Sequence, residues 1–122
     1  MITQISGFPQ GVVAVSYSGL ITAEDYEKTL IPITEEALKA NQKVRFYCEV
    51  EEFEGFRLGA IFDDLKLGFE HLSRLQRTVV VTNVDWIRHY TNFWAFLLPG
   101  LLKVFTFEEK DQAREWVCEG LK

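Results

Sequence analysis

Several features that would point to a particular chemistry are scarce in this sequence of 122 residues. It contains two histidines and two cysteines, and none of them has the C-x-x-C, H-x-x-x-H or H-E-x-x-H spacing of a local metal site. The G-x-S-x-G turn of α/β hydrolases is absent, and so is a glycine-rich loop followed by Lys and Ser or Thr that could cradle phosphate. We therefore expect no enzymatic activity, no metal and no cofactor.

Long hydrophobic runs and an excess of positive charge are also missing. The longest strictly apolar run, Phe93–Leu98, is far shorter than the roughly 18 residues that a membrane-spanning helix needs. The first residues show no basic segment followed by an apolar core, so no secretory leader is predicted. The net charge of −5 argues against nucleic acid, because phosphate binding needs clustered Lys and Arg. We expect a cytoplasmic protein, with peripheral contact to the inner membrane left open.

What the sequence does contain is an alternation of short β-rich runs and amphipathic segments. Thr78–Thr82, TVVVT, is a continuous buried-type run, which predicts an interior strand of a sheet that helices cover on both sides. The turn residues Gly7–Gly11 predict that the first two strands form a hairpin. The predicted strands are Ile2–Ser6, Gly11–Ser18, Lys43–Glu51, Thr78–Thr82 and Leu102–Phe107, and Glu52–Phe56 is predicted to be a loop.

Amphipathic periodicity predicts four helices. The first runs from the Thr22 cap to about Ala40, the second from Leu58 to about Leu75, and the third from an Asn83 or Asp85 cap to Leu98. The fourth is the C-terminal helix that opens at Thr106. Thr22-Ala-Glu-Asp25 and Thr106-Phe-Glu-Glu109 have the pattern of capping boxes, with Asp in place of Glu in the first. Pro32 lies inside the first helix, where it removes a backbone hydrogen bond and predicts a kink or a break.

The order of these elements is β-β-α-β-α-β-α-β-α. After the opening hairpin each strand reaches the next through a helix, which forces mostly parallel pairing with right-handed crossovers. The chain is long enough for one hydrophobic core and too short for two. The prediction is one α/β layered domain over residues 1–122, with a mixed, mostly parallel five-stranded sheet and helices on both faces.

Four stretches carry a family resemblance: Gly19–Glu27, Phe53–Leu72, Val84–Gly100 and Val104–Val117. Together with the order of elements, they resemble the SpoIIAA-like proteins, small bacterial relatives of the STAS domain that are sometimes grouped with the lipid-binding CRAL-TRIO/SEC14 fold. The resemblance covers nearly the whole chain and implies that fold. For this branch of the family it also implies a small apolar ligand or membrane association, without enzymatic activity.

One departure from the wider superfamily concerns a phosphorylation site. Anti-anti-sigma factors act through a serine that follows the third strand, but here that place reads Glu51-Glu-Phe-Glu-Gly-Phe-Arg57. No serine occurs between Ser18 and Ser73, and the glutamates of this stretch would repel a phosphate. We therefore expect no phospho-switch of the sigma-regulator kind.

The predicted ligand site lies beyond the carboxyl ends of the parallel strands, where ligands of α/β sheets bind. Aromatic side chains with a few cationic neighbours are expected to gather there. An apolar mouth edged by cations suits a ligand with an apolar body and an acidic head; the alternative is that the aromatic side chains fill the core and the arginines face solvent. The expected lining is Phe53, Phe56, Trp86, Tyr90, Arg57, Arg88 and His89.

The stretch Asn92–Gly100, NFWAFLLPG, is apolar all around a helix once Thr91 is passed. A stripe of Trp86, Tyr90, Trp94 and Leu97 or Leu98 can belong to the core, whereas Phe96 lies on another face. So small a domain cannot easily bury such a helix on every side. The residues expected to meet a membrane or a partner subunit are Phe93, Trp94, Phe96 and Leu97.

The leading hypothesis is a non-enzymatic binding module for a small apolar or amphipathic, lipid-like molecule. It includes transient membrane contact through Phe93–Leu98. The alternative is a homodimeric interaction module of the STAS type without a phospho-switch, in which the same apolar stretch joins two copies.

Overall fold

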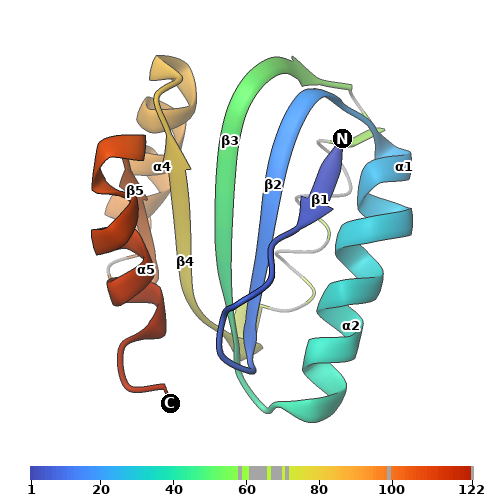
Figure 1. The fold of residues 1–122 in the computed structure, drawn as a ribbon, viewed down its shortest axis with the longest axis vertical. Helices are drawn as coiled ribbons and strands as arrows, with labels where there is room; N and C mark the ends of the chain where they lie inside the picture. Colours follow the sequence, from blue (N-terminus) through green and yellow to red (C-terminus); the bar gives the residue numbers. More distant parts are fainter. Residues whose placement is uncertain (58, 61–65, 67–69, 71, 99, 122) are drawn as a thin grey trace.

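The computed structural model describes residues 1–57, 59–60, 66, 70, 72–98 and 100–121, without the side chains of Glu52, Phe53, Phe56 and Leu72. Its centre is a five-stranded sheet with strand order β1-β2-β3-β4-β5. β1 is antiparallel to β2, and the other three neighbouring pairs are parallel. Helices lie on both faces, α2 on one side and α5 on the other (Figure 1), so the predicted fold class is confirmed. The strands are β1 (Ile2–Gln4), β2 (Val12–Ile21), β3 (Val44–Phe56), β4 (Leu75–Thr82) and β5 (Leu102–Phe105).

The first helical segment is continuous but irregular. It consists of α1 (Ala23–Asp25), the π-helical turn η1 (Tyr26–Leu30) and α2 (Ile31–Ala40). Pro32 lies in the first turn of α2, and the amide of Ile31 just before it donates to the carbonyl of Tyr26, five residues back. The wider π turn is one of the ways in which a helix accommodates a residue that cannot join its hydrogen-bond ladder. The predicted break at Pro32 is therefore wrong: the helical segment continues past this residue, with a π turn in front of it.

Two hydrophobic layers hold the sheet. On one face, Val13, Val15 and Tyr17 of β2 pack with Tyr26 and Leu30 of η1. On the other face, Val79 and Val81 of β4 pack with Ala113 and Val117 of α5 (Lys110–Cys118). Val80 points back to the first layer. Because β4 lies between β3 and β5 and is packed on both faces, the predicted interior position of TVVVT is confirmed.

The predicted loop Glu52–Phe56 is wrong, because β3 continues through it. β2 also continues past Gly19, which takes φ +64 at a shift in register. Phe53 then pairs with Gly19 and Phe56 with Ile21. Pairing between the ends of β2 and β3 lengthens both strands. The sequence did not predict this long-range pairing, because Glu and Gly are uncommon in strands.

Other boundaries move by a few residues. Leu75 pairs with Val44 and begins β4, so the helix predicted to end there stops earlier, and η2 (Leu72–Arg74) is a 3-10 turn. Of the predicted helix, Gly59, Ala60, Lys66 and Glu70 are helical, and the rest lies outside the described residues. β5 ends at Phe105, because Thr106 caps η3 (Phe107–Glu109) through the predicted capping box.

Candidate functional site

Helix α4 (Asp85–Leu97) follows β4 directly and packs on β4 and β5. The predicted caps of this helix are wrong: the N-cap residue is Val84, without a side-chain hydrogen bond. The side-chain oxygen of Asn83 instead accepts a 3.1 Å hydrogen bond from the amide of Phe107. This bond ties the start of α4 to the start of the C-terminal helical segment, so the carboxyl end of β4 is anchored from two sides.

The side of α4 that faces the sheet differs from the predicted one. Ile87 and Thr91 are buried, and Trp94 and Leu98 are partly buried. Trp86 and Tyr90 were predicted to share a core stripe with Trp94, but both are exposed. Neighbouring helix positions lie about 100° apart, and this helix is apolar at both sets of positions, so its periodicity alone could not show which set meets the sheet.

The side of α4 that faces away from the sheet is unusually apolar for a solvent-facing surface. Its large side chains keep 43–82% of their surface exposed, whereas exposed hydrophobic residues usually occur singly. The partly buried Trp94 packs against two of these side chains. The centre of its ring lies 5.6 Å from that of Phe93 and 6.3 Å from that of Tyr90, and both pairs are edge to face. We call this surface the α4 outer face; it consists of Trp86, Tyr90, Phe93, Phe96 and Leu97.

The predicted lining residues divide into two groups. Trp86, Arg88, His89 and Tyr90 all belong to the first two turns of α4. Arg57 follows β3, and the end of β3 bends toward α1, away from α4 (Figure 1). The backbones of Phe53 and Phe56 lie in that same strand end, and their side chains are outside the described residues. The structure thus brings four of the predicted residues together and places Arg57 elsewhere.

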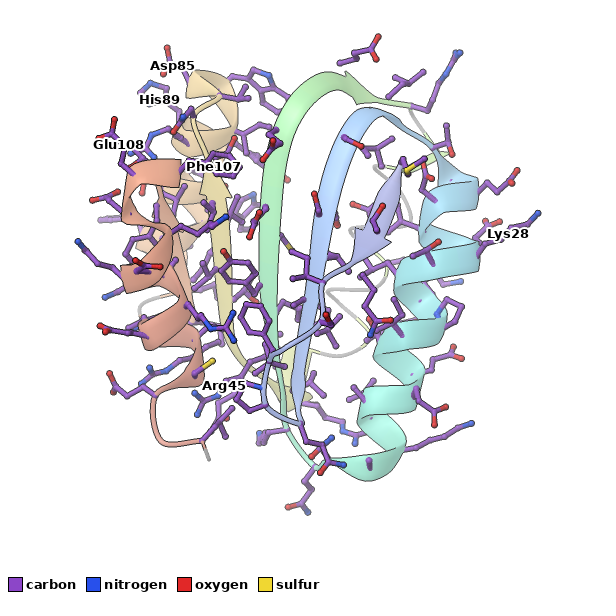
Figure 2. The ribbon with its side chains drawn as sticks, viewed as in Figure 1. Lys28, Arg45, Asp85, His89, Phe107 and Glu108 are labelled. Carbon is purple, nitrogen blue, oxygen red and sulfur yellow. The ribbon has the colours of Figure 1, made fainter. Side chains whose placement is uncertain are left out.

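Carboxylates lie at the same end of the molecule as Arg88 and His89. Figure 2 shows Asp85, His89, Phe107 and Glu108 at one end of the molecule, with Arg45 at the opposite end. Arg88 donates a 3.3 Å hydrogen bond to the carbonyl of Thr82. Hydrogen bonds from the backbone and side chain of Thr106 lower the pKa of Glu109, and the charge of Arg88 adds to that effect. The negative charge of these carboxylates opposes the binding of an anion at this end of α4.

A second polar cluster lies on the α5 side of the sheet. The hydroxyl of Tyr47 donates a 2.8 Å hydrogen bond to Glu49, whose carboxylate lies 3.9 Å from the ammonium of Lys110. Burial raises the pKa of Tyr47 far above its usual value, and the bond to Glu49 raises it further. Tyr47 thus stays neutral while it donates to Glu49, and the pair links β3 to the first turn of α5 through Lys110.

Sequence reasoning missed three arginines that hold helix ends. Arg45 is buried and bonds to the carbonyls of Val117 and Glu119, and Arg77 bonds to that of Trp116. Arg74 does the same for α2, bonding to the carbonyl of Leu38. Arg45 could have been recognised from the sequence, because it is the one charged residue in the apolar run Val44–Cys48. A charged side chain in such a run is rarely buried without partners, so a hydrogen-bonded arginine was to be expected.

Over the described part of the chain, no three His, Cys, Asp or Glu side chains are placed to hold a metal ion. Within the same part, none of the helices combines the length and apolar character that crossing a bilayer requires.

Comparison with known proteins gives one family. A family model described as SpoIIAA-like matches residues 12–118. A crystal structure from Shewanella loihica PV-4, described as an uncharacterised protein of the DUF3478 family with a SpoIIAA-like fold, is similar with a TM-score of 0.71 and 28% identity. The similarity covers 96% of this chain and 93% of that one. No curated protein matches the sequence. Because the family model covers most of the chain, the protein belongs to the SpoIIAA-like family.

Proposed function

We propose that this protein is a non-enzymatic binding module for a small apolar or amphipathic, lipid-like molecule. One observation carries the proposal: five large apolar side chains lie exposed on one helix that is firmly packed on its other side. An exposed apolar patch rimmed by polar residues is typical of a surface that binds something. The SpoIIAA-like resemblance supports the same ligand class.

The chemistry of the α4 outer face supports an apolar partner with a polar end. Trp86 and Tyr90 lie in the first half of the helix, beside Arg88 and His89, and carry an indole N–H and a hydroxyl as well as apolar rings. Phe93, Phe96 and Leu97 lie in the second half, where Thr91–Leu98 contains no ionisable group. A lipid-like molecule would place its polar end near His89 and its chain along Phe93 and Leu97.

The same residues support the absence of catalysis in this proposal. Apart from the hydroxyl of Tyr90 and the indole N–H of Trp86, the α4 outer face is hydrocarbon, so it provides no nucleophile paired with a base. Arg88 and His89 lie close to its first half; Arg88 donates to the carbonyl of Thr82 and its charge acts on Glu109.

The proposal also contains a transient membrane contact through Phe93, Phe96 and Leu97. Aromatic side chains suit the membrane–water interface, but the net charge of −5 opposes adsorption to anionic lipid. Binding to neutral phosphatidylcholine vesicles should therefore exceed binding to vesicles rich in phosphatidylserine.

The first test compares the native and denatured masses of freshly purified protein. A captured ligand would appear as extra mass under native conditions that disappears on denaturation. The second test is flotation with neutral vesicles, comparing the parent protein with Phe96→Ser and Phe93→Ser. Leu20→Ser is the matched control, because Leu20 is an exposed hydrophobic residue on β2, outside α4. We expect Phe96→Ser and Phe93→Ser to lose vesicle binding and Leu20→Ser to keep it. The proposal would be refuted if the native mass equals the mass of the chain alone and the parent protein also fails to float with the vesicles.

A further inference from the structure

We infer that two copies of this chain pair through the α4 outer face, with their α4 helices antiparallel about a two-fold axis between Thr91 and Asn92. In this pairing Trp86 packs on the partner's Leu97, and Tyr90 packs on the partner's Phe93. The inference goes beyond the proposed function, because it concerns what covers the face when no ligand is bound.

The first argument is the spacing of the exposed residues. Trp86, Tyr90, Phe93 and Leu97 follow one another at intervals of four, three and four positions. At about 100° per residue, these four side chains fall within a strip roughly 60° wide along the helix. A narrow strip with alternating steps of three and four is the pattern of a seam between two packed helices.

The second argument is that the strip is self-complementary. A two-fold axis at its midpoint relates each residue to one at the same distance on the other side. The larger Trp86 then meets the partner's smaller Leu97, and Tyr90 meets the partner's Phe93 in an aromatic pair. Antiparallel packing also sets the positive end of each helix dipole beside the negative end of the other.

The third argument is area. Aromatic side chains bury about 150–250 Å² when fully covered. Scaled by the exposed fractions of Trp86, Tyr90, Phe93 and Leu97, the strip offers about 400 Å² per copy, and Phe96 at its side raises this to about 600 Å² if the partner covers it. Two copies together would bury about 800–1,200 Å², which is the size range of weak, transient interfaces. We therefore expect reversible association at micromolar concentrations rather than an obligate dimer.

The fourth argument concerns the polar residues beside the strip, which lack the cations that would hold this face on an anionic bilayer. Helices that lie in a membrane surface carry Lys and Arg on their polar side. Here the exposed polar residues of α4 are Asp85, His89 and Asn92, and the whole chain carries −5. Aromatic residues without surrounding lysines are instead typical of the centres of protein interfaces.

The experiment measures mass by sedimentation equilibrium over a range from about 1 to 500 μM. The parent protein should move from 14.1 kDa toward twice that value as its concentration rises. Phe93→Lys and Tyr90→Glu should each weaken association at least 100-fold, because each buries unpaired charges at the seam. Leu20→Ser should leave the dissociation constant unchanged. Circular dichroism checks that every variant is folded.

The antiparallel register has its own test. In that register position 93 of one copy faces position 90 of the other, so an equimolar mixture of Phe93→Lys and Tyr90→Glu places Lys beside Glu at one contact and keeps the parent pair at the other. The mixture should associate at least tenfold more tightly than either variant alone. In a parallel pair positions 90 and 93 would each face themselves, so mixing would relieve the repulsion between like charges but would form no Lys–Glu contact. The mixture would then still associate at least tenfold more weakly than the parent protein.

Two results would overturn the inference. In the first, the parent protein stays at the monomer mass at every concentration. In the second, the parent protein associates, but Phe93→Lys and Tyr90→Glu have the same dissociation constant as the parent. A monomer that still floats with neutral vesicles would remove the dimer and leave the proposed function standing. A protein that forms the dimer but binds no lipid would support the dimer and refute the proposed function.

Discussion

The guanidinium of Arg45 on β3 donates a 2.8 Å hydrogen bond to the carbonyl of Val117 on α5, 72 residues further along the chain. The same side chain bonds to the carbonyl of Glu119 and to the side-chain oxygen of Gln76. Carbonyls at the end of a helix have no partner within the helix and carry its negative dipole end. Arg45 therefore satisfies the end of α5 from inside the sheet.

Replacing Arg45 by Met should destabilise the protein by about 3 kcal/mol, because the carbonyls at the end of α5 lose a buried, charged donor. The measurement is urea unfolding followed by far-ultraviolet circular dichroism. Arg57→Met is the control, since Arg57 is exposed, and it should change the free energy of unfolding by less than about 0.5 kcal/mol. Equal effects in the two variants would show that the helix-end bonds contribute little.

Acid should weaken the capping box at Glu109. Hydrogen bonds from Thr106 lower the pKa of this carboxyl in the folded protein, so its stabilisation is complete above the unfolded-state pKa of about 4 and is lost as pH falls through the folded-state pKa. Glu109→Gln can still accept the hydrogen bonds but does not titrate. The free energy of unfolding of this variant should fall less steeply between pH 5 and pH 2 than that of the parent protein, as measured by urea unfolding. Parallel curves would contradict this assignment.

Alkali should weaken the Tyr47–Glu49 pair. Burial and the bond to Glu49 raise the pKa of Tyr47, so its contribution is complete below the unfolded-state pKa of about 10 and is lost as pH rises from there toward the folded-state pKa. Tyr47→Phe should be about 1–2 kcal/mol less stable at pH 7, since Glu49 loses a donor. Its stability should also fall less between pH 9 and pH 11 than that of the parent protein. The check is a series of unfolding curves over that range; the same slope in both proteins would argue against the raised pKa.

The two sides of α4 should respond differently to truncation. Ile87 is buried against the sheet, so Ile87→Ala should cost about 2–4 kcal/mol of stability. Phe96 is 82% exposed, so Phe96→Ala should change the free energy of unfolding by less than about 0.5 kcal/mol. Thermal unfolding of both variants measures this contrast. A large loss with Phe96→Ala would mean that this side chain packs within its own chain.

Lipid and the second copy should compete for the α4 outer face. If both use it, a ligand that binds the monomer shifts the equilibrium away from the dimer by mass action. Adding a neutral long-chain amphiphile below its micelle concentration should therefore lower the average mass of a concentrated sample. The average mass is measured by sedimentation equilibrium with and without the amphiphile. An unchanged mass with bound amphiphile would place the two sites on different surfaces.

Much of the local structure follows from short patterns. Thr106-Phe-Glu-Glu109 and Thr22-Ala-Glu-Asp25 form the capping boxes that they predict, and Pro32 marks the irregular turn of the first helix. These features depend on side chains within four residues of one another, so neighbouring letters are enough to recognise them. The caps predicted for α4 were wrong because Asn83 bonds instead to Phe107, a contact across 24 positions.

The order of elements and the run TVVVT determined the layered α/β fold, because each crossover between parallel strands needs a helix and a strand buried on both faces must be interior. Only the tertiary structure decided that β3 extends to Phe56, since that extension depends on pairing with β2. Only it decided which side of α4 faces outward. Ile87 and Trp86 are both apolar, but α4 can pack only one of its sides on β4 and β5, so Ile87 is buried and Trp86 is exposed.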